Sequence, residues 1–344
     1  MGAPGTRGTI YALRHNSDRV SAKITGVDLK KDVVGRFWIE NFYQVPPPED
    51  EAYVRAINRI CRKESIDVLI PQTTRETAKL SKTYESVNAK VMVSDAAAIE
   101  RANNKYSLLK LCESLGIPVP KSKLVKSTAE LREAAKNLGY PHDPVVVKPP
   151  VSWGSRGFRV LREGSSWNAQ RFLSQKPNAT EISLEELVSI LSSDGEADFP
   201  ELIVSEFLPG DEYTVDAFAG EKIAVAIPRL RRETVNGISF RTSLEYRKDI
   251  MENSLKLARA LGLQFAFGFQ FKLDSAGTPK ILECNPRVQG TMAASLFSGA
   301  NVIWMAVREV LGFPYAKLPK PLKKSEFYRY WGGLAFTNQK PVEI

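Results

Sequence analysis

The sequence is poor in the two residue types that hold zinc and that often act as nucleophile or base. Its 344 residues include 2 histidines and 3 cysteines, and Cys61, Cys112 and Cys284 lie far apart. None of these cysteines has the spacing of a metal site, and so few histidines argue against histidine-based nucleophilic catalysis. A small, odd number of scattered cysteines is typical of free thiols in a reducing compartment, so we expect a cytoplasmic protein.

Long apolar runs are also missing. No stretch approaches the ~20 apolar residues of a membrane-spanning helix, and no signal-peptide pattern opens the sequence. We therefore expect no membrane partner. With 43% apolar and 25% charged residues, the composition is that of a globular protein, and the length allows two or three domains.

The net charge is +9, from 48 lysines and arginines against 39 acidic residues. Most of this excess is spread along the chain and does not form a basic stripe with interleaved aromatic residues, so we expect no nucleic-acid partner. A basic balance also suits a protein that binds a polyanionic nucleotide.

The first part of the chain alternates short apolar runs with amphipathic segments. The pattern predicts strands and helices in turn: strands at 22–26, 42–45, 66–70 and 90–93, and helices at 9–16, 51–63 and 74–82. This alternation favours a small parallel α/β domain. The glycine-rich opening Met1–Gly8 has no strand before it, which indicates either a missing first strand or a true start further upstream.

Two later segments have features of a nucleotide site. The apolar strand 144–148 ends on a lysine, and a loop with Gly154 and Gly157 follows; glycines let backbone N–H groups approach phosphate oxygens. Strands over 201–208 and 212–219 flank a Pro-Gly-Asp turn, and such a connection can present backbone groups to adenine and an acid to ribose. Taken alone, each segment is explained equally well by an ordinary hairpin.

The stretch 265–291, FAFGFQFKLDSAGTPKILECNPRVQGT, predicts two strands joined by a turn. A hairpin symmetric about residues 276 and 277 places Gln270 opposite Glu283, and Asn285 continues that face. Oxygen ligands of this kind suit Mg²⁺. By itself, a surface hairpin with incidental polar residues is at least as good an explanation.

Four motifs follow one another along the chain: a lysine at a helix start, a strand that ends in a lysine and a glycine loop, the segment EFLPGDE, and a glutamine followed by ILECNPRVQGT. Together, in this order, they resemble the ATP-grasp superfamily. The likeness is greatest to proteins similar to the large subunit of carbamoyl phosphate synthase, and it covers nearly the whole chain. It implies an α/β and α+β architecture, an ATP-grasp fold with a parallel, Rossmann-like domain before it. The implied boundaries are 1–95 for that domain, 96–121 and 203–320 for the ATP-grasp core, 122–202 for a mobile lid with an insertion near 163–200, and 321–344 for a C-terminal extension.

The resemblance also implies a role for each motif residue. The contacts to the ATP phosphates would come from Lys105, Lys148 and a loop made of Ser152, Trp153, Gly154, Ser155 and Gly157. Adenine would bind the backbone of Glu206, Phe207 and Leu208, and ribose would bind Glu212. The ligands of Mg²⁺, or of Mn²⁺ in its place, would be Gln270, Glu283 and Asn285. The catalytic residues would be Arg287, which meets the transferred phosphoryl group, and Lys148. The loop departs from the family pattern because it contains few glycines and carries Trp153 and Arg156 in place of small residues.

Two arginines lie between the ribose acid and the metal hairpin, in a region that borders the acceptor site in such enzymes. Arg229 and Arg241 are therefore candidates for meeting an anionic substrate or phosphates, although a solvated basic edge strand explains each of them equally well.

We expect an ATP-dependent carboxylate–amine ligase that works through an acyl phosphate and releases ADP and phosphate. Its partners would be a small-molecule carboxylate and amine, and the apolar helix 301–311 could serve either as core or as a homodimer interface. One alternative is phosphorylation of bicarbonate or another small acid, as in carbamoyl phosphate synthesis. Another is a non-catalytic, nucleotide-binding regulatory protein.

Overall fold

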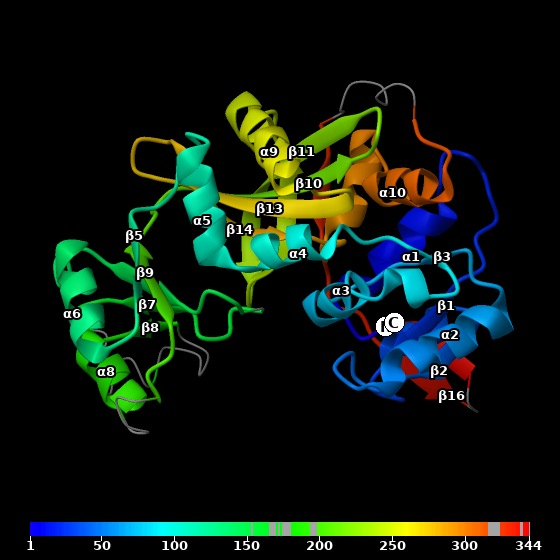
Figure 1. Ribbon diagram of the computed structural model, residues 1–344, viewed down its shortest axis with the longest axis horizontal. Coiled ribbons are helices and arrows are strands. Elements are labelled where there is room, and N and C mark those ends of the chain that lie inside the picture. Colours follow the sequence, from blue (N-terminus) through cyan, green and yellow to red (C-terminus); the bar gives the residue numbers. More distant parts are fainter. Residues whose placement is uncertain are drawn as a thin grey trace. The chain divides into compact units, whose positions relative to one another are not determined.

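The computed structural model describes the chain except residues 153, 165–169, 171–172, 174–179, 193–197, 316–323, 338–339 and 344. The chain forms two compact units. The first unit comprises Met1–Asn103, Asp211–Phe271 and Glu283–Ile344, and the second comprises Asn104–Gly210 and Lys272–Leu282. Figure 1 labels the elements of both.

The N-terminal part of the first unit alternates helices with short parallel strands. In chain order these elements are α1 (Thr6–Arg14), β1 (Thr25–Asp28), β2 (Asn41–Gln44), α2 (Ala52–Glu64), β3 (Val68–Leu69), α3 (Thr74–Leu80), β4 (Lys90–Val91) and α4 (Ala96–Asn103). β1 pairs with β2 and β3 with β4, both in parallel. The described residues therefore form two separate two-stranded sheets here, where the sequence predicted one unit of three or more strands.

Local sequence explains where these helices lie. α2 buries Tyr53, Ile57, Ile60 and Cys61, which recur at helical spacing and pack in one cluster with Leu80. α3 begins at a capping box, in which the Thr73 side chain accepts from the N–H of Glu76 and the Glu76 side chain accepts from the N–H of Thr73.

Most of the first unit is built on a sheet in the order β14-β13-β10-β11-β12-β15. The bounds are β10 (Glu212–Ala219), β11 (Ala224–Val235), β12 (Ile238–Leu244), β13 (Phe265–Leu273), β14 (Pro279–Asn285) and β15 (Glu326–Tyr328). The tip of the β13–β14 hairpin is counted with the second unit. α9 (Lys248–Leu261) packs on β10 and β11, and α10 (Val302–Leu311) packs on β10 and α1. α10 buries Val302–Val307 in this core, so the apolar helix foreseen at 301–311 belongs to the interior.

β11 and β12 are joined by a tight hairpin with an irregular middle. Val235 pairs with Ile238, and the two turn residues Asn236 and Gly237 have φ of 50° and 74°. Positive φ at both positions is the reason for an Asn-Gly turn. Further along, the register shifts on either side of Glu233 and then returns to its original value.

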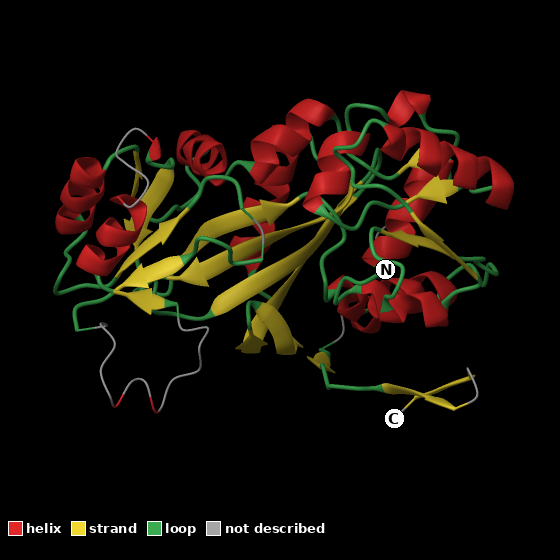
Figure 2. Cartoon of the chain, turned by 90° about the horizontal axis from the view of Figure 1, so that it is seen from below, coloured by secondary structure: helices red, strands yellow, loops and turns green. Residues whose placement is uncertain are grey.

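The second unit is a five-stranded sheet in the order β5-β9-β6-β7-β8 with helices α6 and α8 on one face (Figures 1 and 2). The bounds are α5 (Lys105–Ser114), β5 (Ser122–Val125), α6 (Thr128–Asn137), β6 (Val145–Lys148), β7 (Arg159–Leu161), β8 (Glu181–Ile182), α8 (Leu184–Ser192) and β9 (Leu202–Glu206). Ser183 caps α8 by accepting from the N–H of Glu186 at 3.2 Å.

After α10 the described chain adds β15 to the edge of the six-stranded sheet and ends in a hairpin of β16 (Leu334–Thr337) and β17 (Lys340–Glu343). Among the residues that the structure describes, no helix is both long enough and apolar enough to cross a membrane.

A fully buried ion pair lies in the six-stranded sheet. The Arg229 guanidinium donates to both carboxylate oxygens of Asp216 at 2.7 and 2.8 Å, and also to Thr242 Oγ1 and Thr291 Oγ1 at 3.0 Å each. The Arg229 and Asp216 side chains are 1% and 0% exposed. Each ion lacks water and depends on the other for compensation.

Asp216→Asn should therefore lower the free energy of unfolding by about 3–5 kcal/mol, because it leaves the buried guanidinium uncompensated. Denaturant unfolding of the whole chain measures this loss. Arg132→Met serves as the control: its exposed pair with Glu185 should contribute no more than about 1 kcal/mol. Equal losses of unfolding free energy in the two variants would show that the buried pair contributes no more to stability than the exposed pair.

Candidate functional site

Two lysines of the second unit lie at element ends with their side chains buried. Lys105 starts α5 and is 7% exposed, and its Nζ lies 3.0 Å from the carbonyl oxygen of Ser152 and 3.3 Å from its hydroxyl. Lys148 ends β6, is 8% exposed, and its Nζ lies 3.5 Å from the carbonyl oxygen of Leu282. Burying an ammonium group is costly unless oxygen atoms or an anion surround it, and these carbonyl and hydroxyl oxygens are such partners.

The predicted phosphate loop follows β6. Ser152 contacts Lys105, whereas Trp153 lies outside the described residues. Gly154, Ser155 and Gly157 have positive φ of 62°, 58° and 74°, an unusual backbone that exposes peptide groups. A Cβ on Gly157 would come within 2.6 Å of Pro149, so this position also requires glycine for space.

The predicted adenine segment lies at the end of β9. The N–H of Glu206 donates to the carbonyl of Lys121 at 3.0 Å, so this backbone donor is already paired. The Glu206 carboxylate accepts from the N–H of Lys121 at 2.8 Å and from Lys280 Nζ at 2.6 Å. Leu208 is buried, and the Phe207 ring centroid lies 6.0 Å from Arg162 Cζ.

In the first unit, the end of β14 brings a carboxylate, an amide and a guanidinium together. Asn285 Nδ2 donates to Glu283 Oε1 at 3.0 Å, and Arg287 Nη2 donates to Asn285 Oδ1 at 3.2 Å. Gln270 lies on the neighbouring strand β13 and is partly buried. Burial lowers the pKa of Arg287 from its usual value, while nearby Glu283 and Glu76 oppose that shift. The donor set is one carboxylate and two amides, which is the chemistry of a hard cation such as Mg²⁺.

The hairpin that carries this set differs in detail from the symmetric one that the sequence predicted. The N–H of Asp274 donates to the carbonyl of Thr278, which centres the turn on Ala276, and Gly277 has a φ of 80°. Along β14 the burial pattern changes phase between Leu282 and Glu283, so Glu283 and Asn285 lie on the less buried side.

Glu212, the predicted ribose acid, is paired with an arginine that the sequence analysis passed over. Arg231 donates to Glu212 Oε1 through Nη1, to Ser239 Oγ through Nε at 2.9 Å, and to the Gly237 carbonyl through Nη2 at 2.6 Å. The Arg231 side chain is 6% exposed and that of Glu212 is 25% exposed. Arg231 could have been found in the sequence only from its pairing position opposite Glu212. That position is known only once β10 and β11 are recognised as a hairpin.

The two arginines proposed for an anionic substrate have other surroundings. Arg229 is fully buried against Asp216, so it does not offer its guanidinium to a ligand. Arg241 is about half exposed and faces β15, with Nη2 3.5 Å from Glu326 and Cζ 5.0 Å from the Tyr328 ring centroid.

Gln289 is a further residue that sequence reasoning missed. Its Oε1 accepts from Thr214 Oγ1 at 2.6 Å, and its Nε2 is buried without a hydrogen-bond partner in the part of the chain that the structure describes. Arg287 Nε is likewise buried without a hydrogen-bond partner among the described residues. Two unsatisfied donors just after Asn285 are the kind of groups that a bound anion satisfies.

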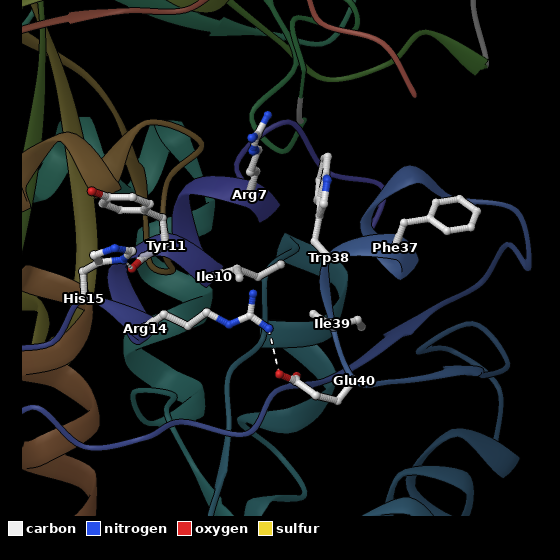
Figure 3. A pocket seen from close by; sticks show the side chains of 9 residues that line it. All are labelled: Arg7, Ile10, Tyr11, Arg14, His15, Phe37, Trp38, Ile39 and Glu40. Atoms are coloured by element: carbon white, nitrogen blue, oxygen red, sulfur yellow. Dashed lines mark hydrogen bonds and ion pairs between the residues drawn. The ribbon is translucent and has the colours of Figure 1, made fainter. Parts of the chain in front are cut away.

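A pocket of about 450 Å³ lies elsewhere in the first unit, between α1 and residues 37–40 (Figure 3). Its polar lining includes Arg7 and Arg14, and Arg14 pairs with Glu40 across it. It contains none of the predicted site residues, and Arg7 is paired with Glu343 of the C-terminal hairpin.

Comparisons with known proteins address the fold and the family of the chain. Residues 198–329 match the family described as "ATP-grasp in the biosynthetic pathway with Ter operon". The large chain of carbamoyl phosphate synthase from Pyrococcus furiosus is 27% identical over 242 residues, which are 67% of this chain and 21% of that protein. The corresponding protein of Thermus thermophilus is 25% identical over 273 residues, which are 76% of this chain and 23% of that one. The chain thus spans about a fifth of the length of these relatives.

Solved structures share the fold at low sequence identity. The ADP complex of N5-carboxyaminoimidazole synthetase from Staphylococcus aureus is 18% identical, with a TM-score of 0.69 over 95% of this chain and 79% of that one. Biotin carboxylase from Campylobacter jejuni is 16% identical, with a TM-score of 0.70 over 95% and 73%. The L-amino acid ligase of Bacillus licheniformis is 14% identical, with a TM-score of 0.65 over 98% and 79%.

The chain therefore has the ATP-grasp fold, as its motifs predicted. Within that class it resembles the large chain of carbamoyl phosphate synthase in sequence.

Gly268→Ala should destabilise the first unit, because a Cβ there would lie 1.6 Å from Gln289 Nε2 and 2.7 Å from the carbonyl oxygen of Val215. We expect a loss of about 1–3 kcal/mol in unfolding free energy, measured by denaturant titration. Adding Gln289→Ala should restore only part of it, since the backbone contact remains. A Gly268→Ala variant as stable as the wild type would contradict this close packing.

Proposed function

We propose that the protein is an ATP-dependent carboxylate–amine ligase that acts through an acyl phosphate. The observation that carries the proposal is the cluster at the end of β14, where Glu283, Asn285 and Arg287 contact one another. The structural neighbours support it, because they include synthetases, a carboxylase and an amino acid ligase, several of them bound to ADP or an ATP analogue.

The chemistry follows from the poor reactivity of a carboxylate towards an amine. A carboxylate oxygen attacks the γ-phosphorus of ATP, the bond to the β-phosphate oxygen breaks, and ADP leaves. The amine then attacks the carbonyl carbon of the acyl phosphate, phosphate leaves with the bonding electron pair, and the amine proton passes to solvent. The protein needs mainly to position the reactants and to balance charge.

In the second unit, Lys105 and Lys148 would bind the ATP phosphates. Both are buried cations with carbonyl or hydroxyl oxygens nearby. The loop of Ser152, Trp153, Gly154, Ser155 and Gly157 would close on the same phosphates through its backbone N–H groups. Adenine would meet the backbone of Phe207 and Leu208, since the N–H of Glu206 is already paired. The assignment of residues 122–202 to a lid that excludes water remains part of this proposal.

In the first unit, Gln270, Glu283 and Asn285 would hold Mg²⁺, which would neutralise phosphate charge and increase the electrophilicity of the phosphorus. Mn²⁺ could take its place. Arg287 would contact the transferred phosphoryl group, and Glu212 would accept hydrogen bonds from the ribose. Arg229 is not assigned to the substrate, because its donors are used inside the sheet. Arg241 stays a candidate for the edge of an acceptor site.

A second candidate is phosphorylation of bicarbonate, because the sequence relatives are large chains of carbamoyl phosphate synthase. ATP hydrolysis that depends on bicarbonate and needs no amine would favour this reaction over the ligase. A homodimer also remains a prediction, and the α10 face first considered for it is buried within the first unit.

Release of ADP in a screen of carboxylate and amine pairs tests the reaction class. We expect ADP and phosphate to form only when a suitable carboxylate is present, and an amide product to require the amine as well. Nucleotide binding without turnover for any acid, bicarbonate included, would favour the regulatory alternative.

Glu283→Gln should lower kcat by at least about 100-fold with little change in thermal unfolding, because it removes the one negative charge of the proposed metal set. Activity assays at increasing Mg²⁺ concentration measure the effect. The control is Glu252→Gln on α9, whose exposed carboxylate pairs with Lys248. Near-normal turnover in Glu283→Gln would remove Glu283 from the metal set.

Lys148→Met should weaken ADP binding by about 10-fold or more, since a charged hydrogen bond to phosphate contributes roughly 1.5–3 kcal/mol. Calorimetric titration of ADP measures it. Lys136→Met, an exposed lysine of α6 in the same unit, is the matched control and should bind ADP normally. Normal ADP affinity in Lys148→Met would argue against a phosphate contact.

A further inference from the structure

Arg231 has no role in the reaction as proposed above, yet it is one of the most constrained charged residues of the first unit. Its side chain is 6% exposed, and its three types of nitrogen contact three different acceptors. Nε donates to Ser239 Oγ, Nη2 to the Gly237 carbonyl and Nη1 to Glu212 Oε1. We infer that Arg231 is the positioning residue for the sugar-binding carboxylate of Glu212, and that it makes the protein selective for ribonucleotides.

The backbone explains why these groups meet. Tyr213 pairs with Leu230 in the antiparallel β10–β11 ladder, and the same register continued by one residue puts Glu212 opposite Arg231. Directly opposed residues of antiparallel strands share a face and lie close enough for their side chains to interact. Glu212 therefore receives its partner from the strand pairing itself.

The other two contacts hold the guanidinium in one orientation. Ser239 and Gly237 both belong to the β11–β12 hairpin, whose Asn236-Gly237 turn is fixed by positive φ at both positions. A planar guanidinium with its Nε and Nη2 occupied has little freedom to rotate, so the Nη1 that faces Glu212 is fixed as well. A lysine could not make these three contacts at once.

The consequence for Glu212 is a carboxylate held in one orientation. Arg231 donates to Oε1, and the Glu212 side chain remains 25% exposed. A carboxylate is an acceptor only, so it binds a ribose through the hydroxyl protons. A nucleotide without those hydroxyls cannot use an oriented carboxylate, and the difference between the two sugars then measures how well Glu212 is held.

The inference rests on the proposed function, because it requires a nucleotide at Glu212. Its test is the affinity ratio of ADP to 2′,3′-dideoxy-ADP, measured by calorimetric titration of the full chain. In the wild type we expect ADP to bind about 10-fold or more tightly, as one charged hydrogen bond predicts. In Arg231→Met and Arg231→Lys the ratio should fall to about 3 or less, through loss of ADP affinity with little change for the dideoxy nucleotide.

Arg232→Met is the matched control. This neighbouring arginine is about half exposed and pairs with Glu245 and Ser243, away from Glu212. It should keep the wild-type ratio. A general loss of stability would lower affinity for both nucleotides alike, so the ratio separates positioning from folding, and thermal unfolding of each variant accompanies the titrations.

Retention of the wild-type ratio in Arg231→Met, with ADP still bound tightly, would overturn this inference and leave the proposed function standing. Equal affinity of the wild type for the two nucleotides would also overturn it. If the wild type binds neither nucleotide with or without Mg²⁺, the proposed function fails first, and the inference fails with it.

Discussion

The antiparallel register of β10 on β11 is the constraint from which most of the first unit's chemistry follows. It places Thr214 opposite Arg229, so that Arg229 reaches Asp216 inside the sheet. Two residues further along the ladder, the same register brings Glu212 to Arg231. A slip of one residue would turn both arginines to the other face of the sheet. The buried pair specifies the register, since any other pairing leaves a charge in the interior without its counterpart.

The two units contribute different kinds of charge. The second unit supplies buried ammonium groups at the start of α5 and the end of β6, next to a loop whose backbone is open to a ligand. The first unit supplies a carboxylate, an amide and a guanidinium at the end of β14, where the Asn285 amide contacts both Glu283 and Arg287. In the first unit, Arg287 Nε and Gln289 Nε2 are buried without a hydrogen-bond partner among the described residues.

The sequence predicted the elements well where its period was clear. The run from Phe265 is a strand, and the 212–219 strand was placed at its observed bounds. The motif ending in Arg287 identified the fold correctly. The sequence could not show where the turn is centred or where the burial alternation of β14 shifts. Both depend on backbone geometry: Gly277 has a positive φ, and the burial pattern of β14 changes between Leu282 and Glu283. Periodicity also could not tell which of Arg229 and Arg231 is interior and which one meets Glu212. The two residues are two positions apart in one strand, so their side chains lie on the same face.

The irregularity between β11 and β12 is confined to a few residues. The ladder has one register up to Arg231, departs from it at Glu233, and regains it at Thr234 before the Asn236-Gly237 turn. One extra residue in β11 is thus compensated by one extra residue in β12, so the pairing beyond them is unchanged. Insertions or deletions that come in such balanced pairs leave the rest of the sheet in frame. A balanced pair of length changes at this patch would therefore leave the pairing of Arg229–Arg231 and the Asn236-Gly237 turn as they are.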